Sequence, residues 1–191
     1  MTTPATPDGD VLRCEAGPGG LPGAAPRPEG PARLVLGDPG APVTITEFGD
    51  LECPYCRQAA EPLRRLVAES DGGVRLVWRH FPLFQVHPHA LVAALAVEAA
   101  ADQGMFWPMQ QALFAQQNRL TEPDLRAVAR TLGLDPDAVT GPAAQPLAAR
   151  VEADYVAGLD LGVAGTPTIY VDGMPYDGPL TLAGLRRALP A

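Results

Sequence analysis

The chain has 191 residues, of which 47% are hydrophobic and 19% are charged. This length and composition predict one domain of ordinary size with a sizeable core, or such a domain enlarged by an insertion. The formal net charge of −8 argues against a phosphate-binding surface, so we expect no nucleic-acid partner. No apolar run reaches the roughly 18 residues of a transmembrane helix, so we expect no membrane partner either.

Residues 1–38 are rich in proline, glycine and alanine and follow neither a helical nor a strand period. They predict a flexible tail, although the apolar residues 34–36 could attach to the domain. The segment lacks the basic and apolar regions of a secretory signal, so for the sequence as given we expect a cytoplasmic location. A Gly-Asp-Pro-Gly turn cluster at residues 37–40 marks the start of the folded domain.

The first predicted strand covers residues 43–48, because four of these six residues are β-branched. Glu47 lies on this strand, six residues before a cysteine. An acid in mid-strand is usually exposed to solvent, but Val43 and Ile45 share the face of Glu47. A partly buried carboxylate could instead take and return a cysteine proton, because burial raises a carboxyl pKa towards neutrality.

The motif Cys53-Pro54-Tyr55-Cys56 follows this strand and begins a predicted helix that runs to about residue 70. Pro54 suits the first helical turn, where its missing N–H would have had no partner. Cys53 then lies at the helix N-terminus, where unpaired N–H groups and the positive end of the helix dipole favour a thiolate. Cys56 lies one turn deeper. This arrangement is typical of a redox-active CxxC pair.

A CxxC pair can also be half of a zinc site or a structural disulfide. No second CxxC pair is present, and the three histidines all come well after the motif, at His80, His87 and His89. We therefore favour redox chemistry without a metal and interpret the histidines as surface or packing residues. The third cysteine, Cys14, lies in the predicted tail. We favour an incidental exposed thiol there over a tethered partner that attacks the CxxC pair.

Residues 74–81 predict a second strand that ends at Pro82. Strand, helix and strand in this order predict a right-handed parallel βαβ unit, and hence an α/β fold. Residues 87–161 are helical in pattern throughout, with a start resembling a capping box at Thr121, a stop at Gly133 and a long helix at residues 145–161. We interpret their apolar stripes as core and expect no cofactor site.

The chain returns to a strand pattern at residues 166–171. The following Asp172-Gly173 pair is the strongest hairpin signal in the sequence, and residues 174–176 are expected to pair back. A helix at residues 181–189 ends the domain. The predicted order is therefore βαβ, helical insertion, ββα.

These features closely resemble the DsbA-like branch of the thioredoxin superfamily, the disulfide oxidoreductases in which a helical domain is inserted into a thioredoxin fold. The resemblance is carried by the CPYC motif, by Glu47 six residues before it, by Trp-Arg-His-Phe-Pro-Leu at residues 78–83 and by Gly-Thr-Pro-Thr at residues 165–168. It extends from about residue 37 to residue 189, which leaves only the tail outside.

The resemblance implies a domain organisation and roles for particular residues. Residues 39–85 and 162–191 are expected to form the thioredoxin-like domain, with residues 86–161 as the inserted helical subdomain. Cys53 is expected to be the attacking thiol and Cys56 the resolving thiol. Pro167 is similar to the family's cis-proline, which turns the preceding backbone outward to pair with an extended substrate segment. The expected substrate-binding residues are Pro54, Tyr55 and Thr166, whose hydroxyl should lie near the sulfurs.

The sequence departs from the strongly oxidising family members, which carry a histidine where this chain has Tyr55. The Pro-Tyr dipeptide is shared with glutaredoxins. Tyr55 adds no positive charge beside the Cys53 thiolate, Glu52 opposes the thiolate, and Arg57 partly offsets that opposition. We therefore predict a Cys53 pKa below the free value of about 8.5 but above the roughly 3.5 of the most oxidising thiols.

The leading hypothesis is a protein thiol-disulfide oxidoreductase that acts on protein thiols and disulfides and exchanges electrons with a thioredoxin-type or glutathione-type system. The absence of a dimerisation module argues against an isomerase. Two alternatives stay open: a redox-sensing or regulatory domain with little turnover, and a glutathione-linked reductase suggested by the Pro-Tyr dipeptide.

Overall fold

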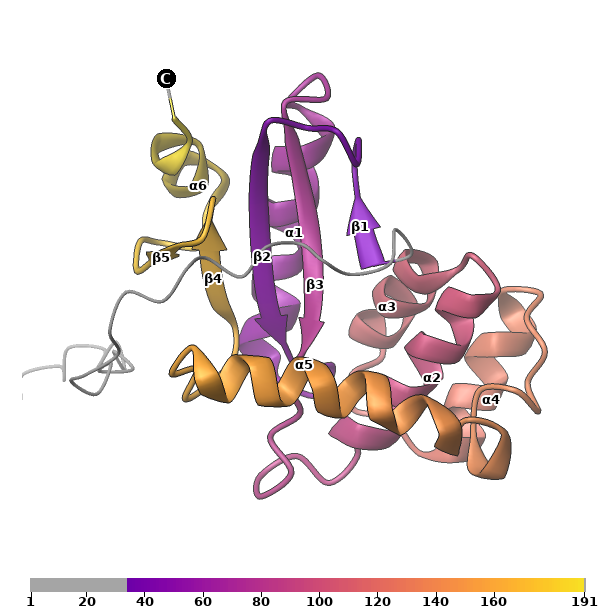
Figure 1. Ribbon diagram of the computed structural model, residues 1–191. Coiled ribbons are helices and arrows are strands. Elements are labelled where there is room, and N and C mark those ends of the chain that lie inside the picture. The colour runs from indigo at the N-terminus through magenta and orange to yellow at the C-terminus, as the bar shows by residue number, and fades with distance from the viewer. Residues whose placement is uncertain (1–33, 191) are drawn as a thin grey trace, which may run out of the picture.

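The computed structural model describes residues 34–190, and its centre is a five-stranded sheet in the order β1-β3-β2-β4-β5 (Figure 1). The strands are β1 Val35–Leu36, β2 Val43–Gly49, β3 Val74–His80, β4 Thr168–Val171 and β5 Met174–Tyr176. β2 and β3 are parallel, whereas every other neighbouring pair is antiparallel. The expected α/β fold and the parallel βαβ unit are confirmed.

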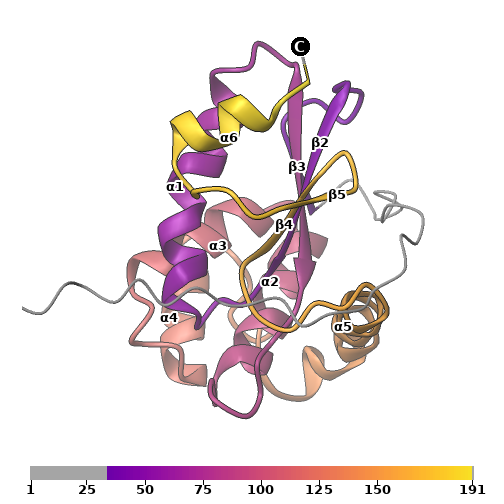
Figure 2. The same ribbon diagram turned by 90° about the vertical axis from the view of Figure 1, so that its left-hand side faces the viewer.

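The helices lie on both sides of this sheet (Figure 2). They are α1 Pro54–Ala68, α2 Ala90–Asp102, α3 Phe106–Ala115, α4 Glu122–Thr131, α5 Ala148–Asp160 and α6 Leu182–Ala188, with short 3₁₀ turns η2 Gly141–Ala143 and η3 Gln145–Leu147. α1 and α6 pack on one face and α5 crosses the other. All the helices from α2 to α5 come between β3 and β4 in the chain, so a helical insertion separates the two halves of a thioredoxin-like fold.

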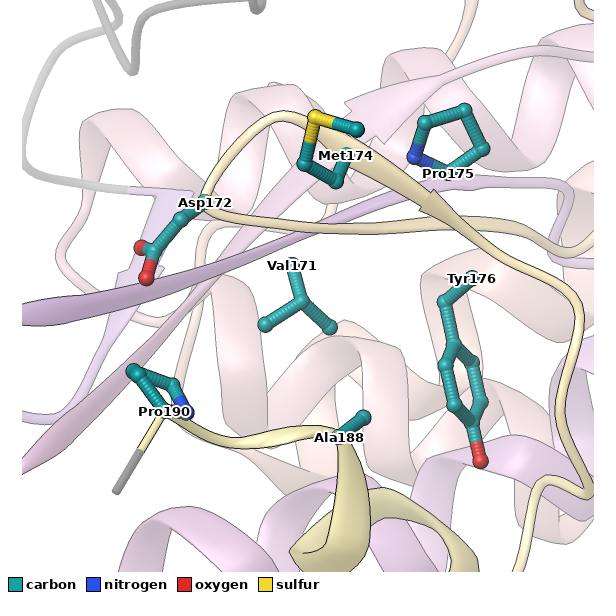
Figure 3. A pocket seen from close by; sticks show the side chains of 7 residues that line it. All are labelled: Val171, Asp172, Met174, Pro175, Tyr176, Ala188 and Pro190. Carbon is teal, nitrogen blue, oxygen red and sulfur yellow. The ribbon is translucent and has the colours of Figure 1, made fainter.

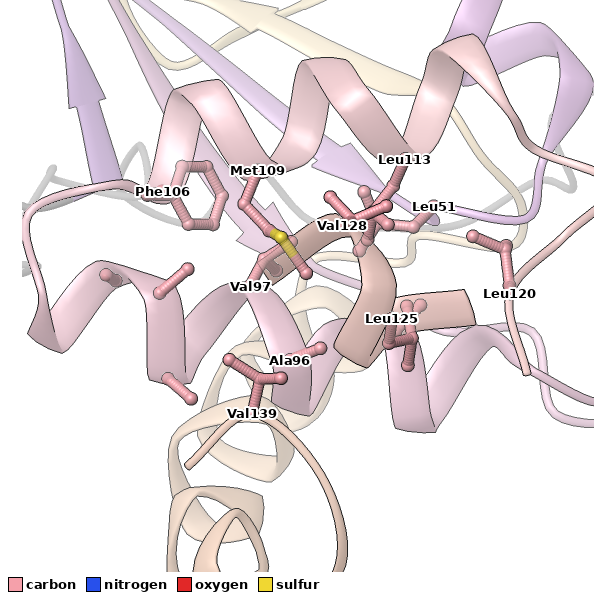
Figure 4. Close-up of a cluster of buried hydrophobic side chains, with 14 of the residues drawn as sticks. Leu51, Ala96, Val97, Phe106, Met109, Leu113, Leu120, Leu125, Val128 and Val139 are labelled. Atoms are coloured by element: carbon pink, nitrogen blue, oxygen red, sulfur yellow. The ribbon is translucent and has the colours of Figure 1, made fainter. Parts of the chain in front are cut away.

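The largest hydrophobic cluster joins the inserted helices to the loop that carries the cysteines (Figure 4). Val97 of α2, Met109 and Leu113 of α3 and Leu125 of α4 meet in its interior. Leu51 belongs to the same cluster, and so do Trp78 and both cysteines of the CxxC pair. The helical insertion therefore forms one side of the environment of the cysteines.

A second, aromatic cluster holds α5 against the sheet. Phe48 of β2 contacts Phe81 and Tyr170 edge to face, and Tyr155 of α5 stacks on Phe81 with ring centroids 4.6 Å apart. Gly158 allows this close approach, because a Cβ at that position would lie 2.6 Å from the Phe81 ring. β2 is thus covered on both faces, and six of its seven residues are buried.

Part of the predicted tail belongs to the sheet, as the apolar character of residues 34–36 allowed. Leu34 is buried, and Val35–Leu36 forms the edge strand that pairs with β3. Trp107 of α3 donates an indole hydrogen bond of 2.9 Å to the Val35 carbonyl oxygen. The contacts of this apolar segment with β3 and α3 order it, although the sequence before it is rich in proline and glycine. Residues 1–33, with Cys14, lie outside the described residues.

Two local predictions can be compared directly with the structure. The long helix expected at residues 145–161 begins only at Ala148, because the 3₁₀ turn Gln145–Leu147 with Pro146 precedes it. The hairpin is confirmed: β4 and β5 are antiparallel, and Asp172 and Gly173 have φ angles of 45° and 77°. Positive φ at both central residues is what a type I′ turn requires.

Candidate active site

The CxxC pair lies where the end of β2 turns into the first turn of α1. Cys53 is the N-cap of α1 with extended backbone angles, and Pro54 takes the first helical position, as the sequence predicts. The Arg57 backbone N–H donates to the Cys53 carbonyl oxygen at 3.2 Å. Both cysteines are free thiols, and Cys56 points into the core at one turn's depth.

The Cys53 thiol is strongly acidic for a cysteine. Its pKa falls from an ordinary value of 9.0 to about 6, first because the Cys56 thiol hydrogen-bonds to it. Thr166 and the backbone N–H groups of Cys56 and Tyr55 lower the pKa further, whereas burial opposes them. At neutral pH the Cys53 sulfur is therefore mainly a thiolate, which is the nucleophilic form.

Cys56 has the opposite character. Its pKa is raised well above 9.0, first by burial and then by its hydrogen bond to Cys53 and by the negative charge of Glu47. The Asp50 backbone N–H donates to the Cys56 sulfur at 3.4 Å, a smaller effect in the other direction. The pair thus combines an outer thiolate with an inner thiol that holds its proton.

Glu47 is a buried carboxyl group, not a solvent-exposed one. Only 1% of its surface is exposed, and burial, followed by the negative charge of Cys53, raises its pKa from 4.5 to about 8. Its Oε1 atom has no hydrogen-bond partner within residues 34–190. A carboxyl group with this pKa can both accept and return a proton near neutral pH.

The Thr166–Pro167 segment lies against the outer cysteine. The Thr166–Pro167 peptide bond is cis, as the family resemblance implied. The Cys53 sulfur lies 3.3 Å from the Thr166 carbonyl oxygen, to which it donates when Cys53 is protonated. The Thr166 hydroxyl is buried and near enough to lower the Cys53 pKa, although in the described part of the chain it makes no hydrogen bond of regular geometry.

The loop before α2 is fastened to the segment that leads into the CxxC motif. The Asp50 carboxylate is buried and accepts the backbone N–H groups of Glu52 at 2.8 Å and Leu83 at 2.9 Å. His87 Nδ1 lies 2.8 Å from the same carboxylate. Glu52 in turn accepts the backbone N–H of His89 at 2.6 Å, and its second oxygen lies 3.1 Å from His89 Nδ1.

These acid–histidine pairs were missed by the sequence reasoning, which treated His87 and His89 as surface or packing residues. The two acids are spaced i and i+2, and so are the two histidines. That matching spacing was the available signal. His80 is a packing residue as expected: it is buried, and its Nδ1 accepts the Trp78 indole N–H at 3.2 Å. In the structure, Glu52 is paired with His89 rather than left to oppose the thiolate alone.

A family model described as "Thioredoxin" matches residues 29–191. The chain belongs to the thioredoxin family. The match includes both halves of the sheet, the inserted helices and the CxxC loop, so it spans every element on which this site is built.

Solved structures place this thioredoxin-family chain beside DsbA-like proteins and confirm that resemblance. A thioredoxin-like oxidoreductase from Silicibacter pomeroyi is 30% identical, with a TM-score of 0.70 over 82% of this chain and 94% of that one. Oxidised BdbD from Bacillus subtilis is 25% identical, with a TM-score of 0.73 over 81% of this chain and 89% of that one. The thiol-disulfide exchange protein α-DsbA2 from Wolbachia pipientis is 18% identical and shares the fold, with a TM-score of 0.70 over 82% and 88%.

Curated relatives carry a different name. A protein named Na⁺/H⁺ antiporter NhaA 1 from Salinispora arenicola is 45% identical over 156 residues, which is 81% of this chain but 24% of that protein. NhaA 1 from Mycobacterium sp. strain KMS is 37% identical over 169 residues, 86% of this chain and 28% of that protein. The chain spans about a quarter of the length of these relatives. Among residues 34–190, no helix is long and apolar enough to cross a bilayer.

Exposed apolar side chains lie on the segments that surround the CxxC motif in this thioredoxin-family chain. Tyr55, inside the motif, is 55% exposed. Phe84 and Val86 are 47% and 66% exposed and belong to the loop that is fastened to Asp50. The Phe84 ring contacts the Tyr155 ring, with ring centroids 5.1 Å apart.

One cavity lies away from this site. It has a volume of about 290 Å³ and is lined by Val171, Asp172, Met174, Pro175, Tyr176, Ala188 and Pro190 (Figure 3). The carboxylate of Asp172 accepts a hydrogen bond from the backbone N–H of Thr44, near the start of β2. The cysteines, in contrast, follow the end of β2. The cavity is therefore at the opposite end of the sheet from the CxxC pair.

Proposed function

We propose that this chain is a thiol-disulfide oxidoreductase that acts on protein disulfides and dithiols through Cys53 and Cys56. The observation that carries the proposal is the opposed acidity of the two thiols: Cys53 has a pKa of about 6, and the Cys56 pKa is raised well above 9.0. One sulfur is thus ready to attack, and the other keeps its proton until it is needed.

In the reducing direction, the Cys53 thiolate attacks one sulfur of a substrate disulfide. A Cys53–substrate disulfide forms, and the other substrate sulfur leaves as a thiolate and takes up a proton. In this mixed disulfide Cys53 no longer has the negative charge that helps to raise the Glu47 pKa, so Glu47 ionises more readily. Ionised Glu47 takes the proton of Cys56, and the Cys56 sulfur attacks the Cys53 sulfur. The Cys53–Cys56 disulfide forms, the second substrate thiolate leaves, and two electrons have passed to the substrate. Oxidation of a dithiol is the same sequence in reverse.

Substrate binding is proposed at the surface around Cys53. An extended substrate segment would pair with the backbone at Thr166, next to Pro167, in the manner of an added strand. The apolar side chains of Tyr55, Phe84 and Val86 would cover the substrate and exclude water, and Pro54 would contribute to the same surface. A surface that offers backbone pairing and exposed apolar side chains suits unfolded or flexible polypeptides more than a small rigid ligand.

The test is the equilibrium reduction potential of the Cys53–Cys56 pair, titrated in glutathione buffers on a Cys14→Ser background. We expect a reversible two-electron couple that is lost in Cys53→Ser. A potential near that of thioredoxin, about −270 mV, supports a reducing role and with it the cytoplasmic location expected from the sequence, and one near about −120 mV supports an oxidising role and contradicts that location. The absence of any reversible couple would rule out the catalytic function itself.

A second candidate is a redox-regulated module that works with a sodium–proton antiporter. It is favoured by the 45% identity to a segment that makes up 24% of an antiporter-named relative. Such a module would bind the antiporter in one redox state and turn over slowly. The test compares binding of the reduced chain, the oxidised chain and Cys53→Ser to the Salinispora arenicola antiporter without its matching segment. Rapid insulin reduction together with redox-independent or absent binding would contradict this candidate.

A further inference from the structure

A second cavity lies along the active-site helix and is lined by residues of α1 and α3. Its volume of about 320 Å³ is within the range of ligand pockets. Arg57, Ala60, Glu61 and Arg64 line it from α1, and Gln110 and Phe114 line it from α3. The catalytic scheme above uses none of these residues.

The cavity contains a cationic group that lacks an acceptor. Arg64 Nη1 is buried and has no hydrogen-bond partner within residues 34–190. A buried N–H without a partner is costly, the more so on a charged group. Arg57 adds a second positive charge and the buried Gln110 adds an amide, against the one negative charge of Glu61. The lining therefore favours a ligand with a carboxylate, which guanidinium groups bind in a planar, two-pronged geometry.

The cavity lies along the same face of α1 as the reactive Cys53. Cys53, Arg57, Glu61 and Arg64 occur at intervals of four, four and three residues, so they lie on one face of α1. At 1.5 Å per residue, Arg64 lies about 16 Å from Cys53 along the helix axis. An extended polypeptide advances about 3.3 Å per residue and covers this distance in about five residues.

We propose that the α1–α3 cavity is a subsite for a carboxylate side chain of an extended polypeptide substrate, placed about five residues from the cysteine that reacts with Cys53. The substrate class rests on the function proposed above. The chain as a whole has a formal net charge of −8 and repels acidic peptides at long range. A preference for an acidic substrate must therefore come from a local site such as this one.

The test measures the rate at which peptides react with the reduced Cys14→Ser, Cys56→Ser protein. Each peptide carries one cysteine as a mixed disulfide with thionitrobenzoate and is otherwise uncharged. The Cys53 thiolate attacks the peptide sulfur, the protein–peptide disulfide forms, and thionitrobenzoate leaves as a coloured thiolate. The peptides carry Glu or Gln five residues before, or five residues after, the cysteine.

At one of the two positions, the Glu peptide should react about tenfold faster than the matching Gln peptide. A factor of about ten corresponds to the free energy of one charge-assisted hydrogen bond. Arg64→Gln should abolish the difference. Arg65→Gln is the matched control, because Arg65 is exposed and pairs with Glu69, and it should keep the difference. Equal rates at both positions, or a preference that survives in Arg64→Gln, would overturn the subsite. If no peptide reacts at all, the proposed oxidoreductase function fails and the subsite with it.

Discussion

Replacing Glu47 with glutamine tests the electrostatics of the buried carboxyl group. In the unfolded chain this group ionises above its ordinary pKa of 4.5, whereas in the folded reduced protein it keeps its proton up to about pH 8. The folded state therefore binds more protons than the unfolded state between these two values. The contribution of Glu47 to stability is fully present below pH 4.5 and is lost as the pH rises towards 8.

The size of this loss follows from the pKa shift. One pKa unit corresponds to about 1.4 kcal/mol, so the loss is about 3 kcal/mol at pH 7 and approaches about 5 kcal/mol above pH 8. Glutamine has nearly the same shape but cannot ionise. Glu47→Gln should therefore be about 3 kcal/mol more stable than the wild type at pH 7, and within about 1 kcal/mol of it at pH 5.

Urea unfolding of the reduced protein at pH 5, 7 and 8 measures this difference. Glu152→Gln is the control, because Glu152 is an exposed acid on α5 and its substitution should change stability little at any of these pH values. A gain from Glu47→Gln that does not grow between pH 5 and pH 8 would refute the reasoning, and so would a loss of stability at pH 8.

Three further substitutions test the surroundings of the cysteines. Cys56→Ala should raise the Cys53 pKa above about 6, since the hydrogen bond from Cys56 is the largest of the causes that lower it. Thiolate absorbance measured against pH would show this rise, and an unchanged pKa would contradict the assignment. His87→Ala should lower the free energy of unfolding by about 1–3 kcal/mol, because it removes a partner of the buried Asp50 carboxylate. In the same urea assay, His89→Ala should cost at most about 1 kcal/mol, since its contact with Glu52 is more exposed; the reverse order would contradict the structure.

The elements that carry local signals could be predicted from the sequence. β2 follows from its β-branched residues, the start of α1 from Pro54, and the β4–β5 turn from Asp172-Gly173, because each signal acts on the backbone within a few residues. The start of the sheet could not be predicted in this way. β1 has only two residues, Val35 and Leu36. It is a strand because it pairs with β3 and because Trp107 donates a hydrogen bond to Val35.

The burial of Glu47 depended on the arrangement of the whole fold. A strand with one face in solvent would have exposed either Glu47 or its neighbours, and the two-residue period does not say which. β2 is a central strand between β3 and β4, with α1 on one face and α5 on the other. Both faces are therefore buried, and the carboxyl group has no solvent side.

The acid–histidine pairs could not be predicted from the sequence for a related reason. Each pair joins residues 37 positions apart, so its formation depends on how the loop after β3 turns back towards the start of α1. Periodicity and turn signals describe neighbours along the chain and contain no information on that approach. Only the equal spacing of the two acids and the two histidines hinted that they might meet.

The acidity of Cys53 has only in part the origin that the sequence suggested. The expected contribution of the N–H groups at the start of α1 is present, but it is not the largest one. The sequence argument weighed the charges of Tyr55, Glu52 and Arg57, and it gave the right direction for the pKa. In the structure, the lowering comes from hydrogen bonds of the Cys56 thiol, Thr166 and the first backbone N–H groups of α1. These groups are held in place by the helix and by the sheet, so the thiolate is stabilised without a charged residue at position 55. A neutral tyrosine in the motif is therefore compatible with a strongly acidic thiol.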